Sequence, residues 1–271
     1  LEHAVIVDFA AHPLRKADLM NPQILSDDLR RRIGALNWYH TMELGESVVT
    51  NGFFDLRPDV YRYRLPEDLS GKTVLDVGAA SGFFSFEFER RGATVTAIDL
   101  PSWKDHDHGP RYWMMEEEKT RSADINQEFE LAREAPGSRV EKKLLNIYDI
   151  SPETVGMFDI VFCGSMILHL TNPIKAIWNL ASVTREMAII ATSVLGGPAN
   201  IPCALFQGQI KGDARWVPTQ ACLEAWVATS TFEGVQYIGD YHPIHKGEAV
   251  GPLQGIIHAY KARENWPEGV K

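Results

Sequence analysis

The stretch Thr73-Val-Leu-Asp-Val-Gly-Ala-Ala-Ser-Gly-Phe-Phe-Ser-Phe-Glu-Phe88 decides the fold of this chain, together with Ala93-Thr-Val-Thr-Ala-Ile-Asp99 a few residues later. Each segment contains a short apolar run, which is typical of a strand buried inside a parallel sheet. Gly78 and Gly82 bracket a tight turn, and the residues that follow predict a helix with phenylalanines on one face. Strand, glycine turn, helix, strand and terminal carboxylate form the first half of a nucleotide-binding βαβ unit.

The turn also indicates which nucleotide is bound. A dinucleotide-binding turn has glycine at its first, third and sixth positions. Counting from Gly78, the third position is Ala80 and the sixth is Phe83, which cannot allow the close packing of helix on strand. Asp76 would repel a pyrophosphate but suits an ammonium group, and Asp99 is placed to accept hydrogen bonds from ribose hydroxyls. The expected ligand therefore carries a ribose and a positive charge without phosphate, as S-adenosylmethionine does; the alternative is an α/β turn without a ligand.

The segment Asp76-Val-Gly-Ala-Ala-Ser-Gly82, with Asp99 after the next strand, resembles the first two motifs of class I S-adenosylmethionine-dependent methyltransferases, although the usual middle glycine is Ala80 here. The resemblance implies an α/β, Rossmann-like fold: a mostly parallel seven-stranded sheet with an antiparallel edge strand and helices on both faces. It implies S-adenosyl-L-methionine as cofactor, and places Asn146 and Ile147 beside the adenine. The expected donor site comprises Asp76, Gly78, Ala79, Ala80, Gly82, Asp99, Leu100, Asn146, Ile147, Cys163 and Ser165.

Composition restricts the partners. The formal net charge of the 271 residues is −9, which weighs against sequence-independent binding to nucleic acid, because phosphate contacts need basic surface. No apolar run approaches the roughly 20 residues of a membrane span, and no signal-peptide pattern opens the sequence. The cysteines, Cys163, Cys203 and Cys222, are far apart and lack metal-site spacing. The expectation is a globular cytoplasmic protein without membrane contact, of undetermined oligomeric state.

Two parts are expected along the chain. Residues 1–65 form an N-terminal helical and aromatic cap, and residues 66–271 form the S-adenosylmethionine-binding domain, with lid insertions near 101–135 and 195–217. In the cap, Ser26 is expected to begin a helix whose arginines at 30–32 either touch an anion or, in the preferred interpretation, form a solvated face. Further helices are predicted at 116–135, after Thr171-Asn-Pro173 and after Thr219, and further strands at 140–148, from 158, at 187–193, at 235–240 and at 253–260.

Methyl transfer is an in-line displacement, so the protein mainly aligns the two reactants and, for a hydroxyl or protonated nitrogen, removes a proton. His169, just past the fourth predicted strand, and His40 are the candidate bases; the alternative for each is a structural histidine. Trp38, Tyr39, Trp103 and Asp105 are expected to line the acceptor pocket, although packing in the core is an alternative for the aromatic side chains.

The run Asp105-His-Asp-His108 is a possible metal site. Its i, i+2 spacing suits a hydrogen-bonded loop better, so no metal site is predicted.

A narrower resemblance covers roughly residues 60–260. Leu65-Pro running into the first strand, His169 with Asn172-Pro173, and the stretch from Arg215 to Trp226 resemble the tRNA wobble-uridine (5-hydroxyuridine) alkyltransferase-like family. Founding members of that family transfer a carboxymethyl group and hold its carboxylate with a Lys, a Tyr and an Arg.

The positions that correspond to those three residues are Val60, Leu168 and Gln254, none of which forms the contacts that a carboxylate needs. The departures favour ordinary S-adenosylmethionine as donor and a small-molecule acceptor, methylated on O, S or N. A tRNA wobble-uridine methyltransferase is the alternative, and a donor-binding protein without catalysis is a third possibility.

Overall fold

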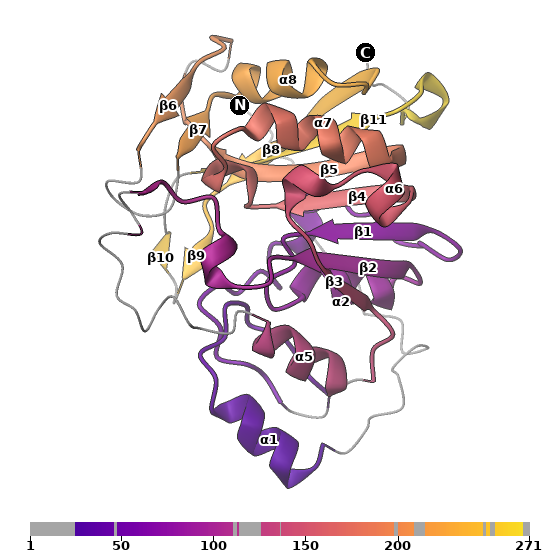
Figure 1. The fold of residues 1–271 in the computed structure, drawn as a ribbon, viewed down its shortest axis with the longest axis vertical. Coiled ribbons are helices and arrows are strands. Elements are labelled where there is room, and N and C mark those ends of the chain that lie inside the picture. Colours follow the sequence, from indigo (N-terminus) through magenta and orange to yellow (C-terminus); the bar gives the residue numbers. More distant parts are fainter. Residues whose placement is uncertain are drawn as a thin grey trace, which may run out of the picture.

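A seven-stranded sheet forms the centre of the structure, a computed structural model that describes residues 25–45, 48–110, 113, 126–135, 137–197, 200–208, 215–245, 248–249 and 253–267. The strand order is β3-β2-β1-β4-β5-β11-β8 (Figure 1). The strands of this sheet are β1 (Thr73–Val77), β2 (Thr94–Asp99), β3 (Glu141–Leu144), β4 (Phe158–Gly164), β5 (Thr184–Val194), β8 (Gly234–Tyr241) and β11 (Leu253–Tyr260).

The sheet is parallel from β3 to β5, and antiparallel pairing is confined to the β11 and β8 end. This confirms the predicted fold class, with one refinement: the reversed strand is β11, which lies between β5 and the edge strand β8. The chain leaves β1 in one direction towards β2 and β3, whereas β4 and β5 lie on its other side. Ligands of such sheets bind in the crevice outside the carboxyl ends of the strands at this reversal.

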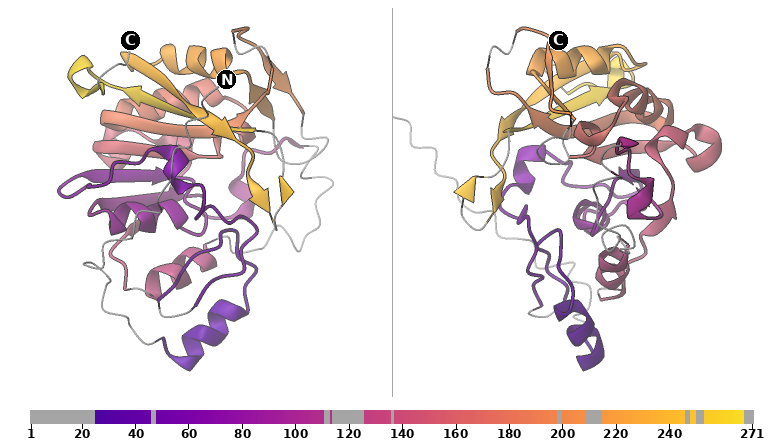
Figure 2. Two further views of the ribbon diagram at one scale, coloured as in Figure 1. Left: turned by 180° about the vertical axis from the view of Figure 1, so that it is seen from behind. Right: turned by 60° about the vertical axis from the view of Figure 1, so that its left-hand side comes forward.

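Helices cover both faces of the sheet (Figures 1 and 2). One core cluster joins Leu75 and Val77 of β1 to the helices α7 and α8, and another joins Val74 to α2. Because side chains alternate along a strand, the apolar run of β1 supplies both clusters. The helices are α1 (Asp27–Gly34), α2 (Phe83–Arg90), α5 (Gln127–Glu134), α6 (Pro152–Val155), α7 (Pro173–Val183) and α8 (Gln220–Ala228), with the 3₁₀ turns η1 (Val60–Tyr63), η2 (Trp103–Asp105), η3 (Ile147–Asp149), η4 (Ile167–His169) and η5 (Arg263–Asn265).

The helix α1 of the predicted cap packs against α5, and the two lie together at one end of the molecule (Figure 1). Ser26 caps α1 as predicted, accepting a hydrogen bond from the Leu29 N–H. Arg31 and Arg32 pair with Asp28 and Glu134 at the surface, which agrees with a solvated face. A third core cluster contains Leu25, Leu29, Ile33, Trp38, Met42 and Leu44 with Leu131, Ala132 and Ala135 of the α5 region.

Several predicted boundaries were wrong. The strand expected at 140–148 ends at Leu144, because Asn146 Oδ1 accepts a hydrogen bond from the Tyr148 N–H and begins η3. The strand expected at 187–193 extends over Thr184–Val194. Of the helix expected at 116–135, the described residues contain α5, and 116–125 lie outside them.

Outside the central sheet, the described residues form two further strand pairs. In the second predicted lid, β6 (Ala204–Phe206) pairs with β7 (Trp216–Pro218), and Leu195 N donates to Pro218 O, which ties this strand pair to the end of β5. The other pair is β9 (Ile244–His245) with β10 (Glu248–Ala249), which are antiparallel. Among the helices of the described residues, none combines the length and the hydropathy that a bilayer crossing requires.

Candidate active site

The glycine turn between β1 and α2 has the left-handed conformations that its sequence indicates. Gly78 has φ +78° and Gly82 has φ +91°. At Gly82 a Cβ atom would lie 2.5 Å from the ring of Phe86 and 2.9 Å from that of Phe129, so only glycine fits. Ala80, which replaces the usual glycine, also has a positive φ, +49°, and holds a conformation that costs alanine about 1 kcal/mol.

Asp99, at the carboxyl end of β2, is joined to this turn. Its Oδ2 accepts a hydrogen bond from the Ala80 N–H, and its Oδ1 accepts one from the Leu100 N–H, both at 2.8 Å. An ionised carboxylate has about four lone-pair sites. Two of them are used here, so the group can still accept bonds from a pair of hydroxyls. The residue is partly exposed at the edge of the sheet.

Asp76, in β1, is 2% exposed and accepts a hydrogen bond from the Ser85 hydroxyl of α2. Burial raises the pKa of the Asp76 carboxyl to about 7, although the Ser85 bond opposes the rise. A buried carboxyl that is half ionised near neutrality would be held in its charged form by a cation nearby. This is the electrostatic condition for an ammonium group beside the turn.

Four of the remaining predicted donor residues lie at the ends of β3 and β4: Asn146 and Ile147 follow β3, and Cys163 and Ser165 flank the last residue of β4. Asn146 uses its Oδ1 to cap η3, and Ile147 is buried behind it. The Cys163 side chain packs in the core with α7, where burial raises its thiol pKa, so it faces away from the edge. Ser165 is exposed, has φ +51°, and donates its N–H to Ala191 O at 2.8 Å.

His40 links the cap to the glycine turn. Its Nδ1 lies 2.8 Å from Oγ of Ser81, and the side chain is 8% exposed. Burial lowers the pKa of His40 to about 3, so the ring is neutral and weakly basic. The structure thus brings His40 to the donor turn, with a partner that the sequence interpretation did not name.

His169 ends η4, directly after β4, and is partly exposed. Its backbone is held on both sides: its N–H donates to Met166 O, and its carbonyl accepts from Nε of Arg215 at 3.2 Å. Arg215 N also donates to Leu168 O at 2.7 Å. The second predicted lid therefore supports the segment that carries the candidate base.

The first predicted lid is fastened at Asp107. Its Oδ2 accepts hydrogen bonds from the Tyr148 hydroxyl at 2.7 Å and from both the N–H and the hydroxyl of Thr171 at 2.6 Å. Its carbonyl accepts a hydrogen bond from Arg215. The loop after β2 is thereby joined to the exits of β3 and β4 and to the second lid.

The four predicted acceptor residues have different surroundings. Trp38 is 4% exposed, packs in the core of the cap and donates its indole N–H to Ile33 O, so its side chain has the packing role that was the alternative. Tyr39 is exposed, and the centroids of its ring and of the His40 ring are 4.7 Å apart in an edge-to-face arrangement. Trp103 is half-buried, with an indole N–H that has no hydrogen-bond partner among the described residues, and Asp105 is exposed and accepts from the Ser102 hydroxyl.

The Asp105 to His108 segment forms a hydrogen-bonded loop. Asp105 and Asp107 have the partners given above, and His106 Nδ1 lies 3.0 Å from Trp103 O. Among the described residues, no group of three or more His, Cys, Asp or Glu side chains is arranged to hold a metal ion.

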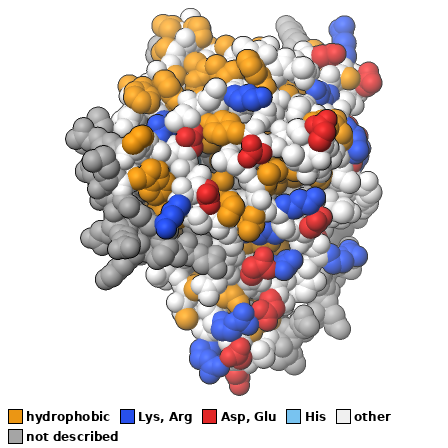
Figure 3. Space-filling view, in the orientation of Figure 1, with side chains coloured by type: hydrophobic (Ala, Val, Ile, Leu, Met, Phe, Trp, Pro, Cys, Tyr) orange, Lys and Arg blue, Asp and Glu red, His pale blue; other side chains and the backbone are white. Residues whose placement is uncertain are grey.

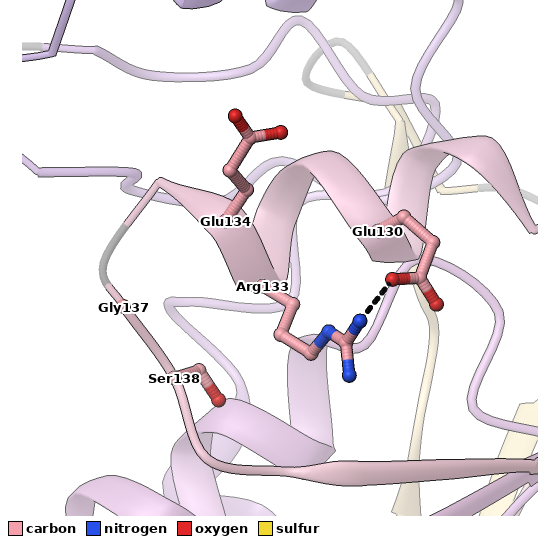
Figure 4. A pocket seen from close by; sticks show the side chains of 5 residues that line it. All are labelled: Glu130, Arg133, Glu134, Gly137 and Ser138. Carbon is pink, nitrogen blue, oxygen red and sulfur yellow. Dashed lines mark hydrogen bonds and ion pairs between the residues drawn. The ribbon is translucent and has the colours of Figure 1, made fainter.

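A surface pocket lies elsewhere, at the end of α5 and the turn after it (Figure 4). It is lined by charged and small residues, and Arg133 pairs with Glu130, which lies one turn earlier on the same helix. None of its residues is a predicted site residue. The lining consists of Glu130, Arg133, Glu134, Gly137 and Ser138.

Sequence reasoning missed several residues that build this edge. The sequence predicts a hydrogen-bonded loop around Asp107 but not the distant segments that it contacts, and it places Ser81 in the turn without a partner. Arg215 opens the stretch quoted for the narrower resemblance, but nothing local indicates that it contacts residues more than forty positions away. A carboxylate or guanidinium in a loop between strands does indicate that the side chain makes a contact of this kind, but it does not identify the partner.

Comparison with known proteins identifies the family. A family model described as a methyltransferase domain matches residues 55–211, more than half of the chain. The ubiquinone biosynthesis O-methyltransferase of Dechloromonas aromatica is 26% identical over 194 residues, which cover 68% of this chain and 74% of that enzyme. The enzyme of the same name from Xanthomonas euvesicatoria is 29% identical over 128 residues, and there the chain spans only 45% of the relative's length.

Solved structures share the fold. The N-terminal domain of EvdMO1, crystallised in the presence of S-adenosylhomocysteine and D-fucose, aligns with a TM-score of 0.58 and 17% identity over 88% of this chain and 98% of that one. The YcgJ protein of Bacillus subtilis aligns with a TM-score of 0.52 and 12% identity over 75% and 97% of the two chains. With the family match and the glycine turn described above, the chain belongs to the class I S-adenosylmethionine-dependent methyltransferases.

Proposed function

We propose that this protein transfers the methyl group of S-adenosylmethionine to a hydroxyl oxygen of a small molecule. The observation that carries the proposal is the junction of Asp99 with the glycine turn at the reversal of strand order, with His40 of the cap bonded to the same turn. The relatives named as O-methyltransferases support oxygen over nitrogen or sulfur as the methylated atom.

The residues of the turn suit the donor. The spare lone pairs of the Asp99 carboxylate would accept hydrogen bonds from the two ribose hydroxyls. The negative charge of the buried Asp76 would balance the positive charge of the donor's ammonium group. Gly78 leaves no side chain between the turn and Met166, whose sulfur would lie 3.0 Å from a Cβ at that position. Asn146 and Ile147 would border the adenine. When bound, the sulfonium supplies a methyl carbon already activated for displacement.

The protein then has to orient the acceptor, exclude water and take up its proton. We propose that His169 is the base that takes up this proton. Arg215 holds its segment beside the exit of β4, and its side chain is partly exposed. His40 is a weaker candidate, since a base with a pKa of about 3 has little driving force to remove a proton from a hydroxyl. Its proposed role is to hold Ser81 and the turn.

A small acceptor is favoured over tRNA by charge. The net charge is −9, and on the face drawn in Figure 3 acidic and basic side chains are interspersed. Tyr39 and Trp103, near the turn and after β2, supply aromatic surface of the kind that lines small-molecule pockets. As part of this proposal, residues 1–65 act as the cap and 66–271 as the donor-binding domain. The cysteines are unpaired, which agrees with a cytoplasmic location.

The test begins with calorimetry of S-adenosylhomocysteine binding, followed by mass-spectrometric detection of methyl transfer to a panel of phenols, sugars and hydroxy acids, with total tRNA as the competing acceptor. Methylation of a hydroxyl compound, and a loss of about a hundredfold or more in turnover for His169→Ala with donor affinity kept, is expected. Methylation of tRNA alone would contradict the proposal, as would donor binding without turnover on any acceptor.

A further inference from the structure

A buried polar pair lies at the edge of the sheet where β4 and β5 end. Gln254, near the start of β11, is paired with Ser193 near the end of β5 and with Tyr241 at the end of β8. Side chains that are directly opposite on neighbouring strands lie on the same face, about 5 Å apart at Cβ. Ile256 and Tyr241 belong to the core cluster on the α2 side, so Gln254 and Ser193 also face that side.

Gln254 is 4% exposed, yet its Nε2 has no hydrogen-bond partner among the described residues. The neighbouring Tyr241 hydroxyl is bonded to the Tyr63 hydroxyl at 2.8 Å. An amide buried without a partner costs about 1–3 kcal/mol, and such groups are rare in native proteins. Ligands of such sheets bind at this edge, so a bound ligand could supply the missing acceptor atom.

The position of Gln254 relative to the donor follows from the strand order. β11 lies two strands away from β4, which at about 4.8 Å per strand is a distance of about 10 Å. Ser165, at the exit of β4, is bonded to Ala191, two residues before Ser193. Gln254 therefore lies beyond the end of β4 on the side away from Asp99. The acceptor has to approach the donor from a side that the ribose and adenine do not occupy.

We infer that Gln254 is a specificity-determining residue that donates a hydrogen bond to a second oxygen of the acceptor, next to the hydroxyl that is methylated. A neutral amide suits a hydroxyl, ether or carbonyl oxygen, whereas recognition of a carboxylate favours a charged partner. The Ser193 hydroxyl, opposite Gln254, offers a second neutral group. The inference rests on the proposed function, because it presumes an O-methylated small molecule.

The experiment compares acceptors that differ by one oxygen on the carbon beside the methylated hydroxyl: catechol with phenol, and D-fucose with its 3-deoxy derivative. Each pair is tested with the wild type, Gln254→Leu and Gln254→Glu. Gln236→Leu is the matched control, because Gln236 lies at the other end of β8, where it accepts a hydrogen bond from Tyr260. Calorimetry with S-adenosylhomocysteine and the melting temperature of each variant separate acceptor effects from donor binding and from misfolding.

The wild type is expected to prefer the compound with the second oxygen, and Gln254→Leu to lower kcat/KM for that compound by about tenfold, the effect of one hydrogen bond. Turnover of the compound without it should stay within about twofold, and the Gln236→Leu control should match the wild type in both. Gln254→Glu keeps the side-chain length and should show the same loss. It replaces the leucine variant in the test if that variant does not fold.

Equal losses on both members of a pair, a drop in S-adenosylhomocysteine affinity, or a wild type without preference would overturn the inference and leave the proposed function in place. A wild type that methylates none of the four compounds counts against both.

Discussion

The Asp107 carboxylate lies 2.7 Å from the Tyr148 hydroxyl and accepts its hydrogen bond, which fastens the loop after β2 to the segment after β3. Thr171, after β4, donates two more hydrogen bonds to the same oxygen. Charge-assisted bonds of this kind are about twice as strong as neutral ones. One side chain thus fixes three segments that surround the expected donor site.

Asp107→Asn should loosen that loop and lower the affinity for S-adenosylhomocysteine by about fivefold to tenfold, because the amide has no charge and accepts fewer bonds. Calorimetry measures the affinity, and hydrogen exchange of residues 101–110 measures the loop. Lys104→Gln, at an exposed position in the same loop, is the control. If the two variants bind S-adenosylhomocysteine with equal affinity, Asp107 contributes to the fold and not to donor binding.

Asp99→Ala removes the carboxylate expected to hold the ribose. Donor affinity should fall by on the order of 2 kcal/mol, or about thirtyfold, because bonds to a charged group are lost. Asp99→Asn, which keeps the size of the side chain, should show a smaller loss. Calorimetry with S-adenosylhomocysteine and with NAD checks both points; tight NAD binding, or an unchanged affinity in the alanine variant, contradicts the donor assignment.

Asp76→Asn should stabilise the protein without donor at alkaline pH. The folded-state pKa of about 7 lies above the unfolded value of 3.8, so the unfolded state releases its proton first and stability falls as pH rises between these values. The variant should gain on the order of 2–4 kcal/mol at pH 8 and nothing near pH 4. Urea unfolding at the two pH values measures the gain, and S-adenosylhomocysteine should bind the variant more weakly. A constant difference across pH would refute this.

His40→Gln should reduce the loss of stability in acid. The unfolded ring binds a proton at a pKa of 6.5 and the folded ring only at about 3, so the contribution is complete above pH 6.5 and is lost as pH falls towards 3. Between pH 7.5 and pH 5 this is about 2 kcal/mol. The glutamine can still form a hydrogen bond with Ser81. Part of the pH dependence of stability should remain in the variant, because His258 also has a lowered pKa, of about 4. Superimposable pH profiles of urea unfolding for the wild type and the variant would contradict this expectation.

The donor should be ordinary S-adenosylmethionine. Leu168 is buried, Val60 packs against the core and Gln254 is neutral, so none of the three supplies a charge for an extra carboxylate. In competition at equal concentrations, the carboxylated donor should transfer its group at least about tenfold more slowly, because a buried carboxylate without a charged partner is unfavourable. A preference for the carboxylated donor would show that these positions are misassigned.

The sequence by itself determined β1, the glycine turn, α2 and β2. Their signals are local: a short apolar run, glycines where φ must be positive, and phenylalanines at helical spacing. The capping residues Ser26, Asn172 and Thr219 were also sufficient to begin α1, α7 and α8, because a cap acts within one turn of its own helix. The donor class followed from the same few residues.

Only the tertiary structure decided which side chains between these elements are buried and which partners they contact. Trp38 and Tyr39 are neighbours in an aromatic segment, yet Trp38 is buried in the cluster that the cap forms with α5, whereas the Tyr39 side chain is exposed. The residues that donate hydrogen bonds to the Asp107 carboxylate are 41 and 64 residues away along the chain. The sequence names Gln254, but its position opposite Ser193 and its unpartnered amide follow only from the pairing of β11 with β5. A local pattern predicts how a segment folds, but the partner of a polar group depends on which distant segments meet.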